Sequence, residues 1–401
     1  MLKGKKIVLG VTGGIAAYKS AELTRLFVKS GADVTVIMTK NATEFITPLT
    51  FGTLSGNPVY TGVFSLTGEW EIGHISLAED ADILVIAPAT ANIIGKIASG
   101  IADDLLSTTV MATRAPILIC PAMNTNMYEN AIVRANMEKL SSMGYFVMNA
   151  EQGELACKTE GSGRLPSVEG ILEEAISILT EKDLKGEKIL VTAGPTREPI
   201  DPVRYVTNYS SGKMGYAIAK VAKRRGAAVI LISGPASLPI PDGVKFISVS
   251  SAVEMKDSVM EHLDESSIII KAAAVADYRP SRYSASKIKK KEDHLSILME
   301  RNPDILYQLG EKKGERVLVG FAMETEDLVK NASGKMIEKN ADLIVANDLS
   351  VEGSGFSHDT NIVKIIDRQG TIEELPRMGK EEVAGRILDR VKKIIRKRDS
   401  G

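Results

Sequence analysis

Two segments of the sequence open in the same way, and this repetition constrains the fold more than any other feature. Residues 5–39 run from KKIVLGVTGG through an amphipathic helical stretch to ADVTVIMT, and residues 187–234 run from EKILVTAGPT through a similar stretch to AAVILISG. Each segment therefore predicts a strand, a crossover helix and a second strand. Parallel strands require such a crossover, so we expect two units that are built on parallel sheets.

Further apolar runs extend both sheets. They read ADILVIAPAT, PILICPA and YFVMNA in the first half, and SIIIKAAA, RVLVGFA and DLIVAND in the second. Because they alternate with helix-period segments, we expect helices on both faces of each sheet. The predicted fold class is α/β, with two doubly wound, mainly parallel-sheet, Rossmann-like domains. A polar stretch at 180–187 separates a helical pattern from a new strand, and we place the domains at 1–181 and 182–401.

The composition limits the partners and the compartment. The chain has 401 residues, with 50 Lys and Arg against 51 Asp and Glu, so that its net charge of -1 gives no general attraction to nucleic acid. Its two cysteines, Cys120 and Cys157, are too few for a disulfide framework. No apolar run approaches the roughly 18 residues of a membrane span. We expect a cytoplasmic protein with no nucleic-acid or membrane partner.

The first glycine-rich turn predicts a phosphate site. Thr12, Gly13, Gly14 and Ile15 lie between a strand and a helix, where backbone N–H groups can bind a phosphate. The glycine spacing is not GxGxxG, and the second strand ends at Thr39 without a carboxylate that could bind a ribose hydroxyl. Both features disfavour a nicotinamide dinucleotide, but they are compatible with a mononucleotide. The alternative is that these glycines only form a tight turn.

Other polar residues should lie at the same edge of the sheet. One loop that follows an apolar strand contains Pro88, Ala89, Thr90 and Asn92, and the loop after ILIC contains Asn124. The carboxyl ends of parallel strands face the ligand crevice in open α/β sheets, so we expect these loops to surround one site.

Five segments of the first half carry a resemblance: VTGGIAAYK, GHISLA, PATANIIGKIASGIADDLLS, PAMNTNMY and ACKTEGSGR. They are similar to the phosphopantothenoylcysteine decarboxylases, in the family of flavin-containing cysteine decarboxylases. The resemblance implies an FMN site formed by Thr12, Gly13, Gly14, Ile15, Thr39, Pro88, Ala89, Thr90 and Asn92. It also implies a route in which a hydride passes from the substrate cysteine to the flavin. The resulting thioaldehyde accepts the electron pair that carbon dioxide loss leaves behind, and the hydride then returns.

The same resemblance assigns three catalytic residues. His74 assists proton removal or orients the carboxylate, Asn124 binds that carboxylate, and Cys157, in a flap rich in Gly and Ser, returns a proton to the ene-thiol. A structural histidine and a helix-capping asparagine are the alternatives for the first two. Cys120, within ILIC, is expected to be inert core.

The second half resembles the phosphopantothenate–cysteine ligases through AGPTREPIDPVRYVTNYSSGKMG, AAAVADYRP, KIKK, NPDI, GFAMET and KMIEKNADLIVAND. A Walker-type phosphate loop is excluded because Met214 stands where a Ser or Thr is required. The resemblance implies that CTP and Mg²⁺ convert the phosphopantothenate carboxylate into an acyl-CMP, from which the amine of cysteine displaces CMP. With both halves in this order, the chain resembles the bifunctional decarboxylase–ligases of coenzyme A synthesis.

This second resemblance also assigns residues. Asp277 binds the metal and the nucleotide, Lys287 binds the triphosphate, and Asn208 is needed for the acyl-CMP to react onward. The remaining nucleotide residues are Asn302, Pro303, Asp304, Ile305, Phe321, Lys335 and Lys339, and those for the substrate phosphate are Arg204, Ser210, Ser211 and Gly212. A charged surface loop around Lys287, a solvated helix face and an Asx turn are the ordinary alternatives.

Two rival functions remain open at this stage, a nonenzymatic flavin-binding regulatory protein and a flavin reductase. The presence of His74, Asn124 and Cys157 together favours the decarboxylase. The resemblance further implies a homo-oligomer, with a trimer-based decarboxylase and a dimeric ligase that can combine into a dodecamer.

Overall fold

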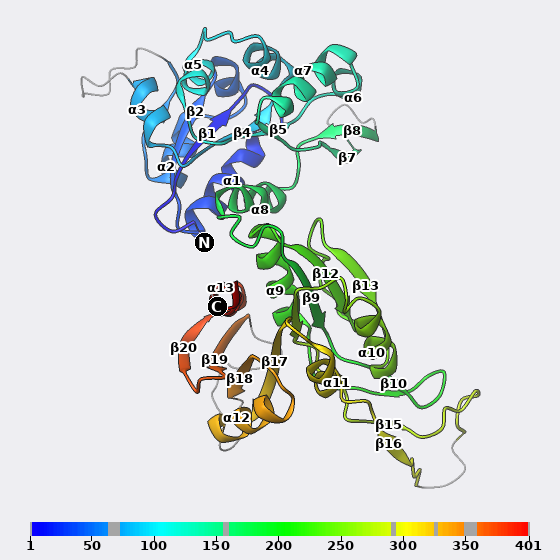
Figure 1. The fold of residues 1–401 in the computed structure, drawn as a ribbon. Coiled ribbons are helices and arrows are strands. Elements are labelled where there is room, and N and C mark those ends of the chain that lie inside the picture. The colour runs from blue at the N-terminus through cyan, green and yellow to red at the C-terminus, as the bar shows by residue number, and fades with distance from the viewer. Residues whose placement is uncertain are drawn as a thin grey trace. The chain divides into compact units, whose positions relative to one another are not determined.

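The computed structural model describes residues 2–62, 73–154, 160–289, 294–324, 328–348 and 359–399. The chain forms two compact units, Met1–Thr180 and Glu181–Gly401 (Figure 1). Each unit contains a mainly parallel sheet, which confirms the predicted α/β fold class. Within the described ranges, every helix falls short of the length or the apolar composition that a bilayer span requires.

The first unit is built on a parallel sheet with the strand order β3-β2-β1-β4-β5-β6. The strands are β1 (Lys6–Val11), β2 (Asp33–Met38), β3 (Val59–Tyr60), β4 (Ile83–Ala89), β5 (Ile117–Pro121) and β6 (Phe146–Val147). The chain reverses its direction of progress across the sheet between β1 and β4. Open α/β sheets bind ligands at the carboxyl ends of such a strand pair.

Helices cover both faces of this sheet (Figure 1). One face packs against α1 (Ala17–Lys29), α2 (Pro48–Ser55) and α8 (Val168–Leu179), and the other against α3 (Gly73–Asp80), α4 (Ala91–Ala98), α5 (Leu105–Ala112) and α7 (Ala131–Ser142). The shorter elements are the 3₁₀ helix η1 (Lys40–Glu44), α6 (Thr125–Tyr128), β7 (Glu151–Glu154) and β8 (Glu160–Arg164). Successive strand residues alternate between the two cores, as the pleat requires. Cys120 is fully buried in one of them, as predicted.

The second unit repeats this plan and extends it. Its sheet has the order β13-β12-β9-β14-β17-β18-β19-β20, in which the last two strands are antiparallel. The strands are β9 (Lys188–Ala193), β12 (Ala228–Ser233), β13 (Lys245–Ser248), β14 (Ile268–Lys271), β17 (Val317–Glu324), β18 (Leu343–Asp348), β19 (Thr360–Asp367) and β20 (Ile372–Gly379). Here the reversal lies between β9 and β14.

Two layers of helices enclose the second sheet. On one face lie α9 (Lys213–Arg224) and α13 (Lys380–Asp399), and on the other α10 (Ala252–Glu261), α11 (Ile305–Lys312) and α12 (Leu328–Glu338). Two small antiparallel pairs stand apart from the sheet, β10 (Glu198–Pro199) with β11 (Tyr205–Val206) and β15 (Tyr278–Pro280) with β16 (Met299–Arg301). Strands of this length carry too little sequence pattern to be predicted.

Candidate active sites

A cavity of about 990 Å³ lies at the carboxyl edge of the first sheet, at the reversal between β1 and β4. Nine residues that the sequence assigned to cofactor or substrate line it: Thr12, Gly13, Gly14, Ile15, Thr39, Pro88, Thr90, Asn92 and Asn124. Ala89 does not line it, because this residue is fully buried at the end of β4. The lining also contains polar residues that were not singled out from the sequence, among them Lys19, Lys40, Asn41, Lys96, Asp104 and Arg164.

The glycine turn before α1 is closely packed. A Cβ on Gly13 would lie 2.4 Å from Cβ of Asn41, whereas a Cβ on Gly14 would meet nothing nearer than Thr90 Cγ2 at 3.6 Å. Helix α1 then begins without a side-chain cap. An uncapped helix N-terminus behind a glycine turn is a favourable place for a phosphate group.

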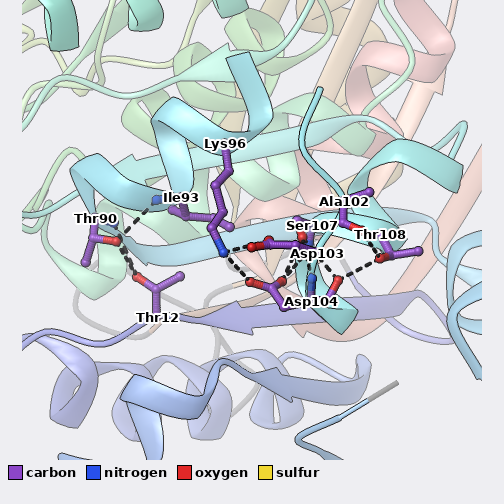
Figure 2. Close-up of polar contacts among 9 residues, drawn as sticks. All are labelled: Thr12, Thr90, Ile93, Lys96, Ala102, Asp103, Asp104, Ser107 and Thr108. Carbon is purple, nitrogen blue, oxygen red and sulfur yellow. Dashed lines mark hydrogen bonds and ion pairs between the residues drawn. The ribbon is translucent and has the colours of Figure 1, made fainter. Parts of the chain in front are cut away.

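A hydrogen-bonded threonine pair joins the two strand ends beside the turn (Figure 2). The hydroxyl of Thr12 donates to the carbonyl oxygen of Pro88 at 2.7 Å. The hydroxyl oxygens of Thr12 and Thr90 lie 3.4 Å apart. Thr90 also caps α4 by accepting from Ile93 N. These contacts hold the β1 and β4 ends together at the floor of the cavity.

The hydroxyl of Thr39 has a different environment. Its Oγ1 is buried and finds no hydrogen-bond partner among the described residues, although Thr39 lines the cavity. A buried hydroxyl without a partner costs free energy, and a bound ligand with a polar group would remove that cost. The residues present thus fit a polar ligand that reaches Thr39.

Lys96 fixes the loop between α4 and α5 at the cavity mouth (Figure 2). Its ammonium donates to Asp103 at 2.7 Å and to Asp104 at 3.0 Å, and Asp104 forms a capping box with Ser107 at the start of α5. The hydrogen bond to Asp103 raises the pKa of Lys96 despite burial. Burial alone would raise the pKa of Asp104, but hydrogen bonds from Ser107 and Lys96 hold it below its usual value.

The three predicted catalytic residues differ in how far the structure describes them. Asn124 lines the cavity and also caps α6, since its Oδ1 accepts from Asn126 N at 2.9 Å. His74 belongs to α3 by its backbone, but its side chain lies outside the description, as does the whole of Cys157. The paired strands β7 and β8 flank the Cys157 segment, and Arg164 of β8 reaches the cavity.

A second cavity, of about 330 Å³, lies at the reversal between β9 and β14 in the second sheet. Six residues assigned from the sequence line it: Ser210, Ser211, Gly212, Asp277, Phe321 and Lys335. The lining also contains Lys213, Lys271, Asn347, Asn361 and Lys380, which the sequence did not indicate. The site is rich in cations and amide groups.

Helix α9 points its N-terminus at this cavity. Gly212 is its N-cap, with φ 79° and no side-chain cap, and the first residues of α9 line the cavity. Gly215 allows the helix to approach the sheet, because a Cβ there would lie 2.5 Å from Ala193 Cβ. The amides of this turn are placed as in known anion sites.

Asn208 shapes the loop that leads to α9. Its Nδ2 donates to the carbonyl oxygen of Ala274 at 2.7 Å, and its Oδ1 accepts from Ser210 N at 3.0 Å. The second bond is the Asx turn that we gave as an alternative from the sequence. Asn208 thereby ties the cavity loop to the end of the β14 segment.

Several assigned residues lie outside the second cavity. Arg204 forms an ion pair with Asp201 at 3.3 Å and donates to the carbonyl oxygen of Ile288, and Lys287 is an exposed residue of the same loop region. The others, which gather near the N-terminus of α11, are Asn302, Pro303, Asp304, Ile305 and Lys339. Asp304 caps α11 and pairs with Lys339 at 3.1 Å.

Within the part of the chain that the structure describes, no group of three or more His, Cys, Asp or Glu side chains is arranged to hold a metal ion. Asp277 is exposed and borders the second cavity. A single carboxylate matches the way in which Mg²⁺ usually binds, with few protein ligands and several phosphate or water oxygens.

Comparisons with known proteins find matches to each half of the chain and to the chain as a whole. Residues 1–180 match the family model described as Flavoprotein, and residues 184–395 match the DNA/pantothenate metabolism flavoprotein C-terminal domain. The coenzyme A biosynthesis bifunctional protein CoaBC of Bacillus subtilis is 48% identical over 98% of this chain and 97% of its own length. That of Escherichia coli K12 is 46% identical, over 97% of both. The crystal structure of a CoaBC C-terminal domain, at 45% identity and a TM-score of 0.48, covers 54% of this chain and 100% of its own.

The two matched domains define a flavoprotein joined to a pantothenate-metabolism domain. The chain belongs to the family of coenzyme A biosynthesis bifunctional proteins. It is a bifunctional enzyme that combines a phosphopantothenoylcysteine decarboxylase with a phosphopantothenate–cysteine ligase.

Proposed function

We propose that FMN is the flavin of the first unit and that CTP and Mg²⁺ drive the ligase of the second. The observation that carries the proposal is the position of one cavity at the sheet reversal of each unit, each beside an uncapped helix N-terminus. The ligase forms 4'-phosphopantothenoylcysteine, and the decarboxylase converts it into 4'-phosphopantetheine.

In the first unit, the turn at Gly13 and Gly14 and the start of α1 hold the FMN phosphate. The Thr39 hydroxyl, which has no partner among the described residues, donates to a polar group of the cofactor. Thr90 and Asn92 border the same space. Bound FMN supplies a reversible hydride acceptor, which gives the decarboxylation an electron sink that no amino-acid side chain provides.

Three residues act on the substrate of the decarboxylase. The Asn124 amide binds the substrate carboxylate from the cavity wall. His74 orients that carboxylate or takes up a proton, and Cys157 donates a proton to the ene-thiol. The last two roles rest on the sequence match, since the structure does not describe these side chains.

In the second unit, an oxygen of the phosphopantothenate carboxylate attacks the α-phosphorus of CTP and pyrophosphate leaves. The cysteine amine then attacks the acyl carbon, and CMP leaves with the bonding electrons. This route requires no Ser or Cys nucleophile. It requires positive charge and hydrogen-bond donors for the polyphosphate, which the Lys335 ammonium and the backbone N–H groups at the α9 N-terminus supply. It also requires a carboxylate for Mg²⁺, for which we assign Asp277. Asn208, whose amide ties the loop before α9 to the carbonyl oxygen of Ala274, is needed for the acyl-CMP to react onward.

The exposed position of Lys287 bears on the oligomer. Lys287 does not line the cavity of its own chain, and Arg204 is held by Asp201. We infer that in the dimeric ligase Lys287 binds the triphosphate in the cavity of the other copy. We keep a trimer-based decarboxylase, a dodecamer as the combined assembly, and a cytoplasmic location as parts of the proposal.

A single-turnover reaction without cysteine tests the ligase chemistry. The chain is mixed with phosphopantothenate, Mg²⁺ and either CTP or ATP, and acyl-nucleotide and pyrophosphate are followed by mass spectrometry. We expect one acyl-CMP per pyrophosphate with CTP, much less product with ATP, and loss of both products in Asp277→Asn. Equal turnover with ATP would contradict the nucleotide assignment, and full activity of Asp277→Asn would contradict the metal assignment.

A further inference from the structure

Lys271 is the last residue of β14, one of the two strands at which the second sheet reverses. Its Cα pairs with Thr192 of β9 on one side and with Gly320 of β17 on the other. The strand before it is a run of buried isoleucines, and its own side chain lines the second cavity. The register of three parallel strands thus fixes a lysine at the floor of the ligase cavity.

The ammonium of Lys271 has no hydrogen bond or ion pair within the described residues. The charged groups around it come from several elements: Lys335 on α12, Asp304 at the start of α11, Asp277 after β14, and Lys213 and Lys380 in the cavity lining. Several of these groups have partners of their own: Asp304 pairs with Lys339 at 3.1 Å, Lys213 pairs with Asp359 at 2.6 Å, and Lys335 donates to the carbonyl oxygen of Phe321 at 3.4 Å.

This environment leaves Lys271 short of negative charge. Burial, followed by the nearby charge of Lys335, lowers the pKa of Lys271 to about 8, although Asp304 and Asp277 oppose the shift. A half-buried ammonium is stabilised when an anion pairs with it. Other hydrogen-bond donors line the same cavity as Lys271, namely the Lys335 ammonium and the uncapped N-terminus of α9.

We propose that Lys271 is a further substrate-binding residue of the ligase, and that its ammonium donates to a phosphate group bound in this cavity. The phosphate belongs either to the nucleoside triphosphate or to phosphopantothenate. The inference rests on the proposed function of the second cavity and extends it to a residue that the sequence did not indicate. Its position on a central strand, instead of a loop, makes it a fixed point for the anion.

The test measures binding by calorimetry to the full-length chain, in separate titrations with CTP and Mg²⁺ and with 4'-phosphopantothenate. Lys271→Met removes the charge and keeps much of the length, and Lys271→Arg keeps the charge. Lys330→Met is the matched control, because Lys330 is an exposed lysine of α12. We expect Lys271→Met to weaken one of the two ligands by about 10- to 100-fold, which is typical of a lost hydrogen bond to a charged group. The affected titration identifies the phosphate.

The dependence of binding on pH separates a direct contact from a structural effect. With a pKa of about 8, the charged fraction of Lys271 in the free protein falls about tenfold between pH 7 and pH 9. Between pH 7 and pH 9, the affinity of the unsubstituted chain for the affected ligand should therefore fall by a similar factor. Lys271→Arg measures the pH dependence that does not come from Lys271, because its guanidinium stays charged, and the fall in the unsubstituted chain should exceed it by that factor. Lys330→Met should follow the unsubstituted chain.

Three outcomes decide the inference. Unchanged affinity of Lys271→Met for both ligands overturns it, even when the unsubstituted chain binds CTP. If Lys271→Met fails to fold, as shown by loss of its thermal transition, Lys271→Arg decides: tight binding that does not vary with pH supports the contact, and a pH profile like that of the unsubstituted chain refutes it. An unsubstituted chain that binds neither ligand refutes the proposed function of the cavity itself.

Discussion

Two threonines of the first cavity should respond in opposite ways to the same substitution. Thr39 Oγ1 is buried without a partner among the described residues, whereas Thr12 Oγ1 donates to Pro88 O at 2.7 Å. Valine has nearly the shape of threonine and lacks the hydroxyl. Thr39→Val therefore removes an unsatisfied group, and Thr12→Val leaves a buried carbonyl with one partner fewer.

The sizes follow from the cost of an unsatisfied buried polar group, about 1–3 kcal/mol. In the flavin-free protein, Thr39→Val should raise the free energy of unfolding by about 1–2 kcal/mol, and Thr12→Val should lower it by about 1–3 kcal/mol. For a unit of this size, each kcal/mol moves the transition by about 2–4 °C. Thr39→Val should also bind FMN about 2- to 10-fold more weakly, because the hydrogen bond to the cofactor is lost.

Calorimetry of the flavin-free chain and an FMN titration measure both effects. The transition that rises when FMN is added belongs to the first unit, since a ligand stabilises only the unit that binds it. If Thr39→Val destabilises the flavin-free protein as much as Thr12→Val does, the Thr39 hydroxyl has a partner in the protein and the reasoning is wrong. Unchanged FMN affinity would separately refute the contact with the cofactor.

Three further predictions concern stability, each measured by urea unfolding. Gly13→Ala places a Cβ 2.4 Å from Asn41 Cβ and should lower the free energy of unfolding by about 1–3 kcal/mol. The Cβ of Gly14→Ala lies 3.6 Å from Thr90 Cγ2, so this variant should stay within about 0.5 kcal/mol of the unsubstituted chain. Equal losses in the two variants would contradict the difference in packing. Asp104→Ala removes the capping box of α5 and should cost about 0.5–2 kcal/mol, so that an unchanged midpoint would refute the role of the cap. A hydrogen bond from Arg225 lowers the pKa of Asp183 to about 2 despite burial. The ionised Asp183 carboxylate therefore contributes fully to stability above its ordinary pKa of 3.8, and this contribution is lost as the pH falls through about 2. Asp183→Asn should lose less stability than the unsubstituted chain between these two pH values. An unchanged dependence of stability on pH would argue against the shift in pKa.

The parallel sheets could be predicted because strands such as β1, β12 and β14 are continuous apolar runs, and segments with a helical period alternate with such runs along the chain. The antiparallel edge of the second sheet was not predicted. In β19, buried and partly exposed residues alternate, as in a strand with one buried face, and such a pattern is weaker than the apolar run of β14. The short pairs β10–β11 and β15–β16 depend on loop contacts that no local pattern contains.

In the candidate sites too, a local sequence pattern identified some residues and not others. The glycine turn and the loop at Thr90 could be found because they follow strands directly, and parallel strands end at one edge. Lys271 and Lys96 could not be found in this way. Lys271 ends a run that looks like plain core, and only the pairing of three strands shows that it faces a cavity. The position of the Lys96 ammonium depends on Asp103 and Asp104 across a loop. The position of the Arg204 guanidinium depends in the same way on its ion pair with Asp201.

The most direct test of two linked activities in one chain is the stoichiometry of the complete reaction. The purified protein is supplied with phosphopantothenate, cysteine, CTP and Mg²⁺, and pyrophosphate, carbon dioxide and phosphopantetheine are quantified together. We predict one carbon dioxide and one phosphopantetheine for each pyrophosphate, and we predict that His74→Asn still releases pyrophosphate but stops at phosphopantothenoylcysteine. A folded, yellow protein that releases neither pyrophosphate nor carbon dioxide would contradict the account.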